Sequence, residues 1–343
     1  MATCTNNAAA WLSAAKAHPF QVKEAPLWKP EENEVLVRNH AVAINPVDSS
    51  LQTRAWWPMN YPTMLGQDVA GEVIAVGPNV TRFKPGDRIL GHAVGMATKR
   101  NQDNAFQAHT IVQVNMASEL PDHIPYENAA VLPLAFSTAC CGLFQDEFLK
   151  MQLPTEPRAS FTGKTLLVWG GASCVGSNAI QLAVAAGHEV ITTASPKNFD
   201  YVKKLGATQV LDYSSPTVTE DLVQALQGKT LAGVMDCIGF SATPVCAEVV
   251  SKTEGAKFVA TVQGRFPAPP EGVSVKQVFG TTIKDNFVGK AVYENLLPHA
   301  LRAGTFVPAP APLVVGNGLE SIQTAVDRYG QGGISAQKLV VLL

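Results

Sequence analysis

Alternating strand and helix patterns between residues 165 and 263 constrain the fold of this 343-residue chain more than any other feature. Short apolar runs typical of buried strands occur at 165–170, 188–195, 208–213, 232–239 and 255–263. Helix-forming stretches lie between them, as right-handed crossovers between parallel strands require. This part of the chain therefore predicts an α/β fold with a doubly wound parallel sheet.

The first strand leads into the segment GGASCVG, which predicts a dinucleotide-binding turn. The first glycine of such a turn makes the tight bend, the second lets the backbone approach the pyrophosphate, and the third lets the helix pack on the strand. Gly171 and Gly176 fit the first and third positions. Ser173 replaces the middle glycine and offers a hydroxyl and an N–H to a phosphate. The predicted cofactor-binding residues of the turn are Gly171, Ala172, Ser173, Cys174 and Val175, with a plain structural turn as the alternative.

The end of the second strand distinguishes NADP from NAD. An NAD site places Asp or Glu there to bind the ribose hydroxyls. The segment SPKN instead supplies Ser195, Lys197 and Asn198, with no acid at the strand end. A hydroxyl and an ammonium suit a 2′-phosphate, so we expect NADP(H); the alternative is that Lys197 caps a surface turn. Tyr213, which closes the third strand, is expected to cover the adenosine.

The first third of the chain is β-rich. Strand-like segments at 34–45, 68–77 and 82–92 are broken by Gly and Pro, which predicts a small barrel or an irregular sheet. The stretch 126–149 has helical spacing, and Pro133 is expected to start or kink its helix. We expect domains at 1–134 and 135–284, and a C-terminal part, 285–343, that returns to the first domain.

Charge and cysteine content exclude several classes of protein. The net charge is −2 with no basic stripe, which argues against binding to nucleic acid or to an anionic membrane. No apolar run reaches the roughly 20 residues of a membrane helix, and the N-terminal segment is a poor secretory signal. The six cysteines form no C-x-x-C pair, so reduced thiols in a cytoplasmic protein are expected.

Several segments together resemble the medium-chain dehydrogenase/reductase superfamily: EVLVRNHAVAINPVD, LGQDVAGEVIAVG, LPLAFSTA, GGASCVG, LGATQVLDY and DCIG. The chain is most similar to the zinc-free quinone oxidoreductases and the fungal trans-acting enoyl reductases. The resemblance covers essentially the whole chain and implies a GroES-like β-rich barrel domain beside a Rossmann domain. It also implies that Thr138 lies near the nicotinamide and that Ile238 contacts the cofactor.

The chain departs from the zinc members of this superfamily at the metal positions. Those proteins place a Cys where Asn45 stands and a His-Glu pair where Gln67 and Asp68 stand, and the loop 91–112 has none of their four structural cysteines. Zinc needs three or four converging Cys, His or carboxylate ligands. His92 lies in the wrong stretch to be one and is expected to be structural, so we expect no metal.

The metal-free branch commonly reduces conjugated C=C bonds or quinones. Hydride reaches the carbon β to a carbonyl, so hydrogen-bond donors must face the carbonyl oxygen. The catalytic candidates are Asn45 and Tyr61, with loop packing as the alternative for Tyr61. Asp48 either binds the cofactor ribose or fixes its own turn. We expect an NADPH-dependent, zinc-independent enoyl or enone reductase of fungal secondary metabolism; the alternatives are a quinone or ketone reductase and a non-catalytic NADPH-binding protein.

Aromatic residues suggest an apolar substrate. Trp56 and Trp57 lie in a loop expected at the substrate, or else cover a subunit interface. Phe136 and Phe279 are further candidates for the substrate wall, with core packing as the alternative. The expected substrate is a small apolar or conjugated carbonyl compound, free or carrier-bound. The sequence leaves open whether the protein is a monomer or a homodimer.

Overall fold

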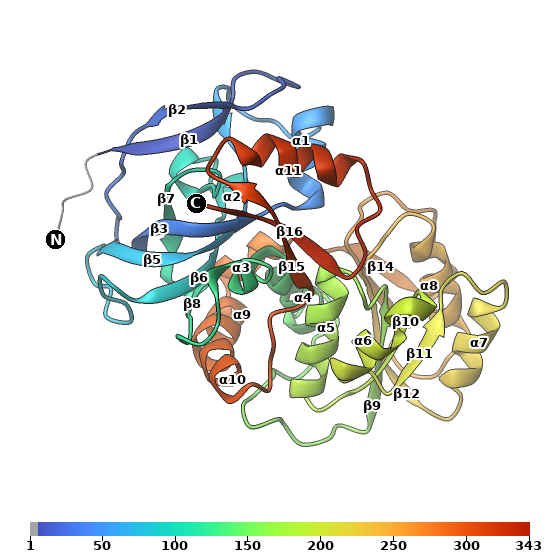
Figure 1. Ribbon diagram of the computed structural model, residues 1–343. Helices are drawn as coiled ribbons and strands as arrows, with labels where there is room; N and C mark the ends of the chain where they lie inside the picture. Colours follow the sequence, from blue (N-terminus) through green and yellow to red (C-terminus); the bar gives the residue numbers. More distant parts are fainter. Residues whose placement is uncertain (1–5) are drawn as a thin grey trace. The chain divides into compact units, whose positions relative to one another are not determined.

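The chain forms two compact units (Figure 1). The computed structural model describes residues 6–343, so Cys4 lies outside the described residues. Unit 1 contains residues 1–134 and 311–343, and unit 2 contains residues 135–310. The predicted boundary at residue 134 and the return of the C-terminus to the first domain agree with this division.

Unit 2 is built on a parallel sheet of six strands. Their order is β11-β10-β9-β12-β13-β14, and every neighbouring pair is parallel. The order reverses at β9, as in doubly wound dinucleotide-binding folds, which confirms the predicted fold class. The strands are β9 (Lys164–Trp169), β10 (Glu189–Ala194), β11 (Gln209–Asp212), β12 (Thr230–Asp236), β13 (Phe258–Thr261) and β14 (Ser274–Gln277).

Helix α4 precedes β9, and one helix follows each strand from β9 to β12, at the positions expected from the sequence. These helices are α4 (Pro133–Phe144), which Pro133 begins, α5 (Cys174–Ala185), α6 (Phe199–Lys204), α7 (Val218–Ala225) and α8 (Ala242–Ser251), with a 3₁₀ turn at Pro196–Asn198. Buried apolar side chains of α7 and α8, such as Leu222 and Val249, share one core with Leu167 and Val234 of the sheet. This burial holds the strand ends, and the loops that follow them, in fixed register.

The segment 285–310 belongs to unit 2, whereas the sequence placed it with the first domain. It contains α9 (Phe287–Lys290), a π-helical turn (Ala291–Leu296) and α10 (Leu297–Ala303), and it follows the 3₁₀ segment Gly280–Asp285. Tyr293 and Phe306 lie edge-to-face on Phe136, with ring centroids 5.3 and 5.6 Å away. This fully buried aromatic cluster holds the segment against α4.

Unit 1 contains two sheets. The larger has the order β15-β16-β3-β5-β6-β8, with β7 also paired to β3, and the smaller has the order β2-β1-β4. The strands are β1 (Asn7–Leu12), β2 (Gln21–Ala25), β3 (Glu34–Ala43), β4 (Thr63–Met64), β5 (Asp68–Val76), β6 (Arg88–His92), β7 (His109–Gln113), β8 (Ala117–Glu119), β15 (Ala311–Asn317) and β16 (Gln337–Leu342). All pairs in these sheets are antiparallel except that of β15 with β16, which is parallel, and the two sheets form the predicted β-rich domain.

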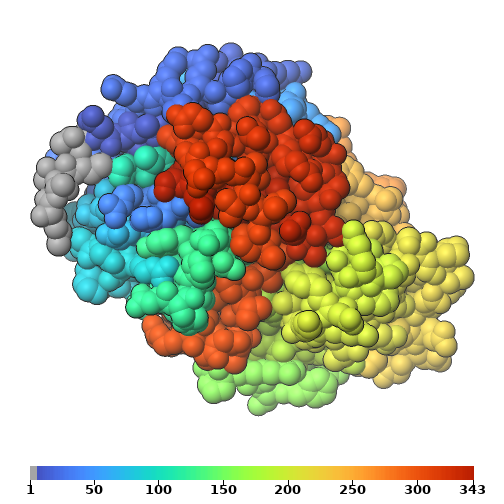
Figure 2. Space-filling view, in the orientation of Figure 1, coloured from blue at the N-terminus to red at the C-terminus, as the bar shows by residue number. Residues whose placement is uncertain are grey.

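The last strand, β16, joins unit 1 by pairing antiparallel with β3. Figure 2 accordingly shows C-terminal residues, in red, beside N-terminal residues, in blue. The helices of this unit are α1 (Pro46–Arg54), α2 (Gly95–Thr98), α3 (Tyr126–Ala129) and α11 (Ser321–Gly330), with 3₁₀ turns at Asn101–Asp103 and Val114–Met116. Ala43 of β3 pairs with Asp68 of β5 on one side and with Val340 of β16 on the other. Three segments that are distant in sequence therefore lie side by side.

One helical stretch, Tyr126–Phe144, is long and apolar enough to cross a membrane by length and composition, with a mean hydropathy of 1.3. Its most apolar window is 78% buried inside the protein. That degree of burial is typical of a core helix, which passes the same test of length and composition.

Candidate functional site

The turn after β9 has the geometry of a nucleotide-binding turn, but its tight bend is made by Gly170 rather than Gly171. Gly170 has φ +81°, which favours glycine. Gly171 has no room for a side chain, because a Cβ would lie 2.3 Å from Thr192 Oγ1 of β10. A Cβ on Gly176 would lie 2.2 Å from the Gly170 carbonyl oxygen, so α5 begins in direct contact with the turn. The third-glycine role of Gly176 therefore holds.

Ser173 is the N-cap of α5. Its Oγ accepts a hydrogen bond from the Gly176 N–H over 3.0 Å, and its own N–H donates to the Gly170 carbonyl. The Ser173 N–H that the sequence assigned to a phosphate is thus used within the turn, whereas the hydroxyl keeps its own hydrogen to donate. The N–H groups of the first helical turn, such as that of Val175, are the ones that α5 offers to an anion.

Other cofactor candidates gather at the carboxyl edge of the same sheet. Because the strands are parallel, the segments after β10, β11 and β12 lie at the edge where the Gly170–Gly176 turn lies. Asn198 Nδ2 donates to Ser195 Oγ over 3.1 Å, and Lys197 beside them is exposed. Tyr213 and Ile238 expose 49% and 44% of their surface, so both have apolar area available to a ligand. No acidic residue stands at the end of β10.

Asp236, which the sequence did not single out, holds the turn that carries Ile238. Its buried carboxylate accepts hydrogen bonds from the Ile238 and Gly239 N–H groups over 3.0 and 2.8 Å, and from the hydroxyls of Thr243 and Thr261. Four donors on one carboxylate compensate its removal from water. The turn then directs Ile238 toward Gly170, where a Cβ would lie 2.5 Å from Ile238 Cγ1.

The aromatic and hydroxyl candidates on α4 and after β14 lie in different surroundings. Thr138 is half-buried against Gly280, where a Cβ would lie 2.8 Å from Thr138 Oγ1. Phe279 precedes Gly280 and is half-buried. Phe136 is fully buried between Tyr293 and Phe306. This environment is that of the core-packing alternative and not of a substrate wall.

In unit 1, Asn45, Asp68 and Lys338 meet in one buried cluster, the Asn45–Asp68–Lys338 triad. The registers of β3 with β5 and with β16 bring these three segments together. Lys338 Nζ donates to Asn45 Oδ1 over 2.5 Å and lies 2.9 Å from Asp68 Oδ2. Asn45 Nδ2 donates to the same Asp68 oxygen over 2.7 Å. The three residues are at most 3% exposed.

Asp48 lies beside the triad, in the first turn of α1. Its two carboxylate oxygens accept the backbone N–H groups of Asn45 and Gly66 over 2.8 and 3.2 Å. Complete burial raises the pKa of Asp48 to about 7; the hydrogen bonds from Asn45 and Gly66 oppose that shift, and the charge of Asp68 adds to it. These contacts are those of the turn-fixing alternative, because each carboxylate oxygen accepts a backbone N–H of the segments that Asp48 joins.

His92 also belongs to this region, which its place in the sequence did not indicate. It faces Asp68 across the β5–β6 pair, and its Nε2 lies 3.3 Å from Gln67 Oε1. Burial lowers the pKa of His92 to about 4, so the imidazole is neutral at pH 7. A buried imidazole hydrogen-bonded to Gln67 is consistent with the structural role expected for His92, although the pairing of β5 with β6 brings it beside Asp68.

The loop after α1 presents aromatic side chains. Trp56 is 48% exposed and its Nε1 donates to Ser50 Oγ over 3.0 Å. Trp57 lies edge-to-face with Trp56, with the ring centroids 5.6 Å apart, and packs against the core of unit 1. Tyr61 is half-buried and packs against the same core. Trp56 is thus the aromatic side chain of this loop with the most surface available to an apolar ligand.

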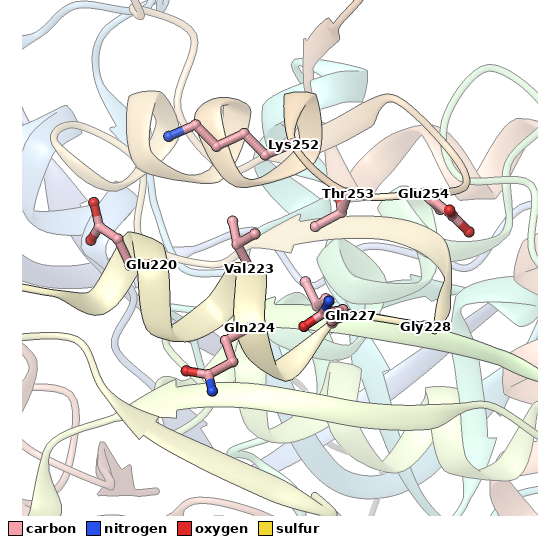
Figure 3. Close-up of a pocket in the computed structure, with 9 residues that line it drawn as sticks. Glu220, Val223, Gln224, Gln227, Gly228, Lys252, Thr253 and Glu254 are labelled. Atoms are coloured by element: carbon pink, nitrogen blue, oxygen red, sulfur yellow. The ribbon is translucent and has the colours of Figure 1, made fainter.

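A separate surface pocket of about 470 Å³ lies between α7 and α8 (Figure 3). Its walls include Glu220 and Gln224 of α7 and the segment from Lys252 to Glu254 that follows α8. These helices end here, so the pocket lies at the amino edge of the parallel sheet, opposite the nucleotide turn. None of the residues predicted to bind cofactor or substrate lines it.

Comparison with known proteins identifies the family. The sequence model of the alcohol dehydrogenase GroES-like domain matches residues 31–122, and that of the zinc-binding dehydrogenases matches residues 174–302. The zinc-binding alcohol dehydrogenase domain-containing protein cipB of Emericella nidulans is 68% identical to this chain, over 100% of both. The chain belongs to the medium-chain dehydrogenase/reductase superfamily.

Two further proteins are similar to this chain over nearly its full length. The trans-enoyl reductase himH of Aspergillus japonicus is 39% identical over 98% of this chain and 97% of its own. The crystal structure of an alcohol dehydrogenase superfamily protein from Novosphingobium aromaticivorans has a TM-score of 0.79 and 25% identity, over 98% of this chain and 99% of that one. Membership makes the chain an oxidoreductase with a nicotinamide cofactor, and confirms the predicted GroES-like and Rossmann domains.

The zinc that one family model names does not fit the residues of this chain. Asn45, Gln67 and Asp68 stand where zinc members carry metal ligands. The ammonium of Lys338 donates a hydrogen bond to Asn45 and forms an ion pair with Asp68. An amide and a carboxylate already held by a cation are a poor donor set for zinc, which prefers thiolate and imidazole. Within residues 6–343, no three His, Cys, Asp or Glu side chains converge as a metal site would require.

Proposed function

We propose that this chain is a zinc-independent, NADPH-dependent reductase of an activated C=C bond, of the enoyl or enone type, that acts in the cytoplasm in fungal secondary metabolism. The observation that carries the proposal is the Asn45–Asp68–Lys338 triad, because it places an amide donor where zinc members hold a metal ligand. The similarity to a trans-enoyl reductase over nearly the whole chain supports this reaction class.

Unit 2 provides the cofactor site of the proposal. The N–H groups at the start of α5 bind the pyrophosphate, and Ser195, Lys197 and Asn198 bind the 2′-phosphate. Tyr213 and Ile238 cover the adenosine and ribose with apolar surface, while Thr138 contacts the nicotinamide. Bound NADPH supplies a hydride from C4 of that ring.

Unit 1 provides the groups that act on the substrate. As the β-carbon accepts hydride, negative charge develops on the carbonyl oxygen, and the amide N–H of Asn45 stabilises that charge. A proton then reaches the α-carbon, for which Tyr61 is the candidate donor. Trp56 and Phe279 offer apolar surface to the substrate, as a conjugated carbonyl compound requires.

Isotope transfer tests the proposal. The purified protein is incubated with NADPH carrying deuterium at the transferable C4 position and with a simple conjugated enone, and the label is located in the product by NMR. We expect deuterium on the β-carbon. Deuterium on the carbonyl carbon makes the chain a ketone reductase, and tight NADPH binding without turnover on enones, ketones or quinones makes it a binding protein. Either result refutes the proposed reaction.

Two controls sharpen the result. Elemental analysis of the same preparation should find much less than one zinc per chain, and activity should survive a chelator. The assay is repeated with the enoyl group on a carrier-protein thioester, since the relatives include trans-acting reductases. A rate advantage for the carrier-bound form would identify the form of the substrate.

A further inference from the structure

Lys338 is a buried cation that precedes four apolar residues in β16. It is the second residue of β16, and the four residues from Lys338 to Val341 are all buried. Lys338 is 3% exposed. Lysine is among the residues least often buried, because its ammonium loses water that only good partners can replace. Its position therefore needs an explanation beyond strand formation.

The contacts of Lys338 determine the orientation of the Asn45 amide. An ammonium has donors only, so the Asn45 atom 2.5 Å from Nζ has to be the oxygen. The amide nitrogen then faces the Asp68 carboxylate, to which it donates over 2.7 Å. With the amide reversed, its NH₂ would face the ammonium and its oxygen would face the carboxylate. Both contacts would be repulsive, so the charges on Lys338 and Asp68 allow one orientation.

Asp68 is held from the other side as well. Its second oxygen accepts the Leu134 N–H over 2.7 Å, so the carboxylate cannot turn away from Asn45. The Asn45 nitrogen carries two hydrogens, and the bond to Asp68 uses one of them. The second hydrogen then has a direction fixed by Lys338 and Asp68 together.

We propose that Lys338 is a positioning residue that fixes the Asn45 amide so that its second N–H hydrogen-bonds the substrate carbonyl oxygen. The proposal rests on the proposed reductase function. Lys338 acts through Asn45 and does not touch the substrate. A fixed donor is more effective than a mobile one, because no reorganisation is needed when charge develops on the oxygen.

A double-mutant cycle tests this role. The variants are Asn45→Ala, Lys338→Met and the two combined, and kcat on an enone is measured at saturating NADPH, per NADPH-binding site. Removing a single oxyanion donor typically costs about 100-fold in kcat, and we expect that order of loss for each single variant. The combined variant should be no slower than Asn45→Ala alone. Equal losses from Lys338→Met in both backgrounds would overturn the proposal.

Two further variants separate positioning from folding. Lys338→Arg keeps the charge and should recover most of the lost kcat. If Lys338→Met does not fold, because it leaves Asp68 buried without its cation, the cycle is run with Lys338→Gln, whose neutral amide can still donate to Asp68. With either substitution, NADPH affinity should stay within about twofold of the parent protein, because the cofactor residues lie on unit 2.

The outcomes distinguish this proposal from the proposed function. If the chain reduces a ketone or quinone instead of an enone, the same cycle is run on that acceptor, and coupling between residues 45 and 338 still supports the role of Lys338. If it reduces enones without such coupling, the role of Lys338 alone is refuted. If it turns over nothing, the affinity for a saturated ketone in the presence of NADP⁺ replaces kcat, and additive losses overturn the proposal.

Discussion

A methyl group at Gly176 should separate helix α5 from the nucleotide turn. In Gly176→Ala the new Cβ would lie 2.2 Å from the Gly170 oxygen and 2.8 Å from Gly171 Cα, whereas ordinary contact begins at 3.4 Å. Both neighbours are backbone, so the helix start has to withdraw by roughly 1 Å in a close-packed interior. That shift exceeds what a 2.9 Å hydrogen bond to a phosphate tolerates.

The loss of NADPH affinity in Gly176→Ala can be estimated as that of one charge-assisted hydrogen bond. Such a bond contributes about 1.5–3 kcal/mol, so the Kd for NADPH should rise roughly 10- to 100-fold. Calorimetric titration with NADPH measures this, and thermal unfolding should show a lower Tm as well. Gly330→Ala in α11 is the matched control, because nothing lies within 4 Å of its Cβ. It should leave the Kd unchanged; wild-type NADPH affinity in Gly176→Ala would refute the placement of the pyrophosphate.

Three other perturbations have defined outcomes. In fluorescence titrations, Lys197→Ala should weaken NADPH binding roughly 10-fold and leave NADH binding unchanged. The control Lys252→Ala, at the pocket between α7 and α8, should change the affinity for neither cofactor. Equal effects of Lys197→Ala on both cofactors would contradict the 2′-phosphate assignment. Because the ring of Phe136 is fully buried, Phe136→Ala should lower the free energy of unfolding by about 3–5 kcal/mol in urea titrations and leave the KM for the enone unchanged. A changed KM without lost stability would show that Phe136 contacts the substrate. The raised pKa of Asp48 means that the folded chain holds this proton more tightly than the unfolded chain, so its contribution to the free energy of unfolding should fall as pH rises from 3.8 to about 7. Urea titrations across that range should show a slope that Asp48→Asn removes, and an unchanged slope would show that Asp48 does not titrate there.

The fold was predictable because its signals are local. Each strand of the parallel sheet from β9 to β13 contains a short apolar run, and each strand from β9 to β12 is followed by a helix pattern. The sixth strand, β14, was missed because its four residues are exposed or half-buried and carry no apolar run. The segment 285–310 was assigned to the wrong domain because an apolar helix pattern does not indicate which core the helix joins. Its Tyr293 and Phe306 pack on Phe136 of unit 2, a contact that the pattern does not encode.

The candidate site was only partly predictable, for a related reason. The nucleotide turn is contiguous in sequence, although Gly170 and not Gly171 makes its bend. Lys338 was missed because a lysine near a strand end usually points to water, and its partner Asn45 is 293 residues away in the chain. The proximity of His92 to Asp68 was not foreseen, because only the pairing of β5 with β6 brings the two residues together. Sequence periodicity reports the burial of a position but not its partner across a sheet.

The return of β16 to unit 1 sets an order of events during synthesis. Asn45 is made 293 residues before Lys338, which corresponds to roughly 15–60 s of translation at 5–20 residues per second. Throughout that time Asp68 has no ammonium to pair with, and the edge of β3 that β16 will cover is open. Unit 2, which is continuous in sequence, is complete before unit 1. The nascent chain therefore contains all of unit 2, the nucleotide-binding domain, before Lys338 has been added to complete the Asn45–Asp68–Lys338 triad.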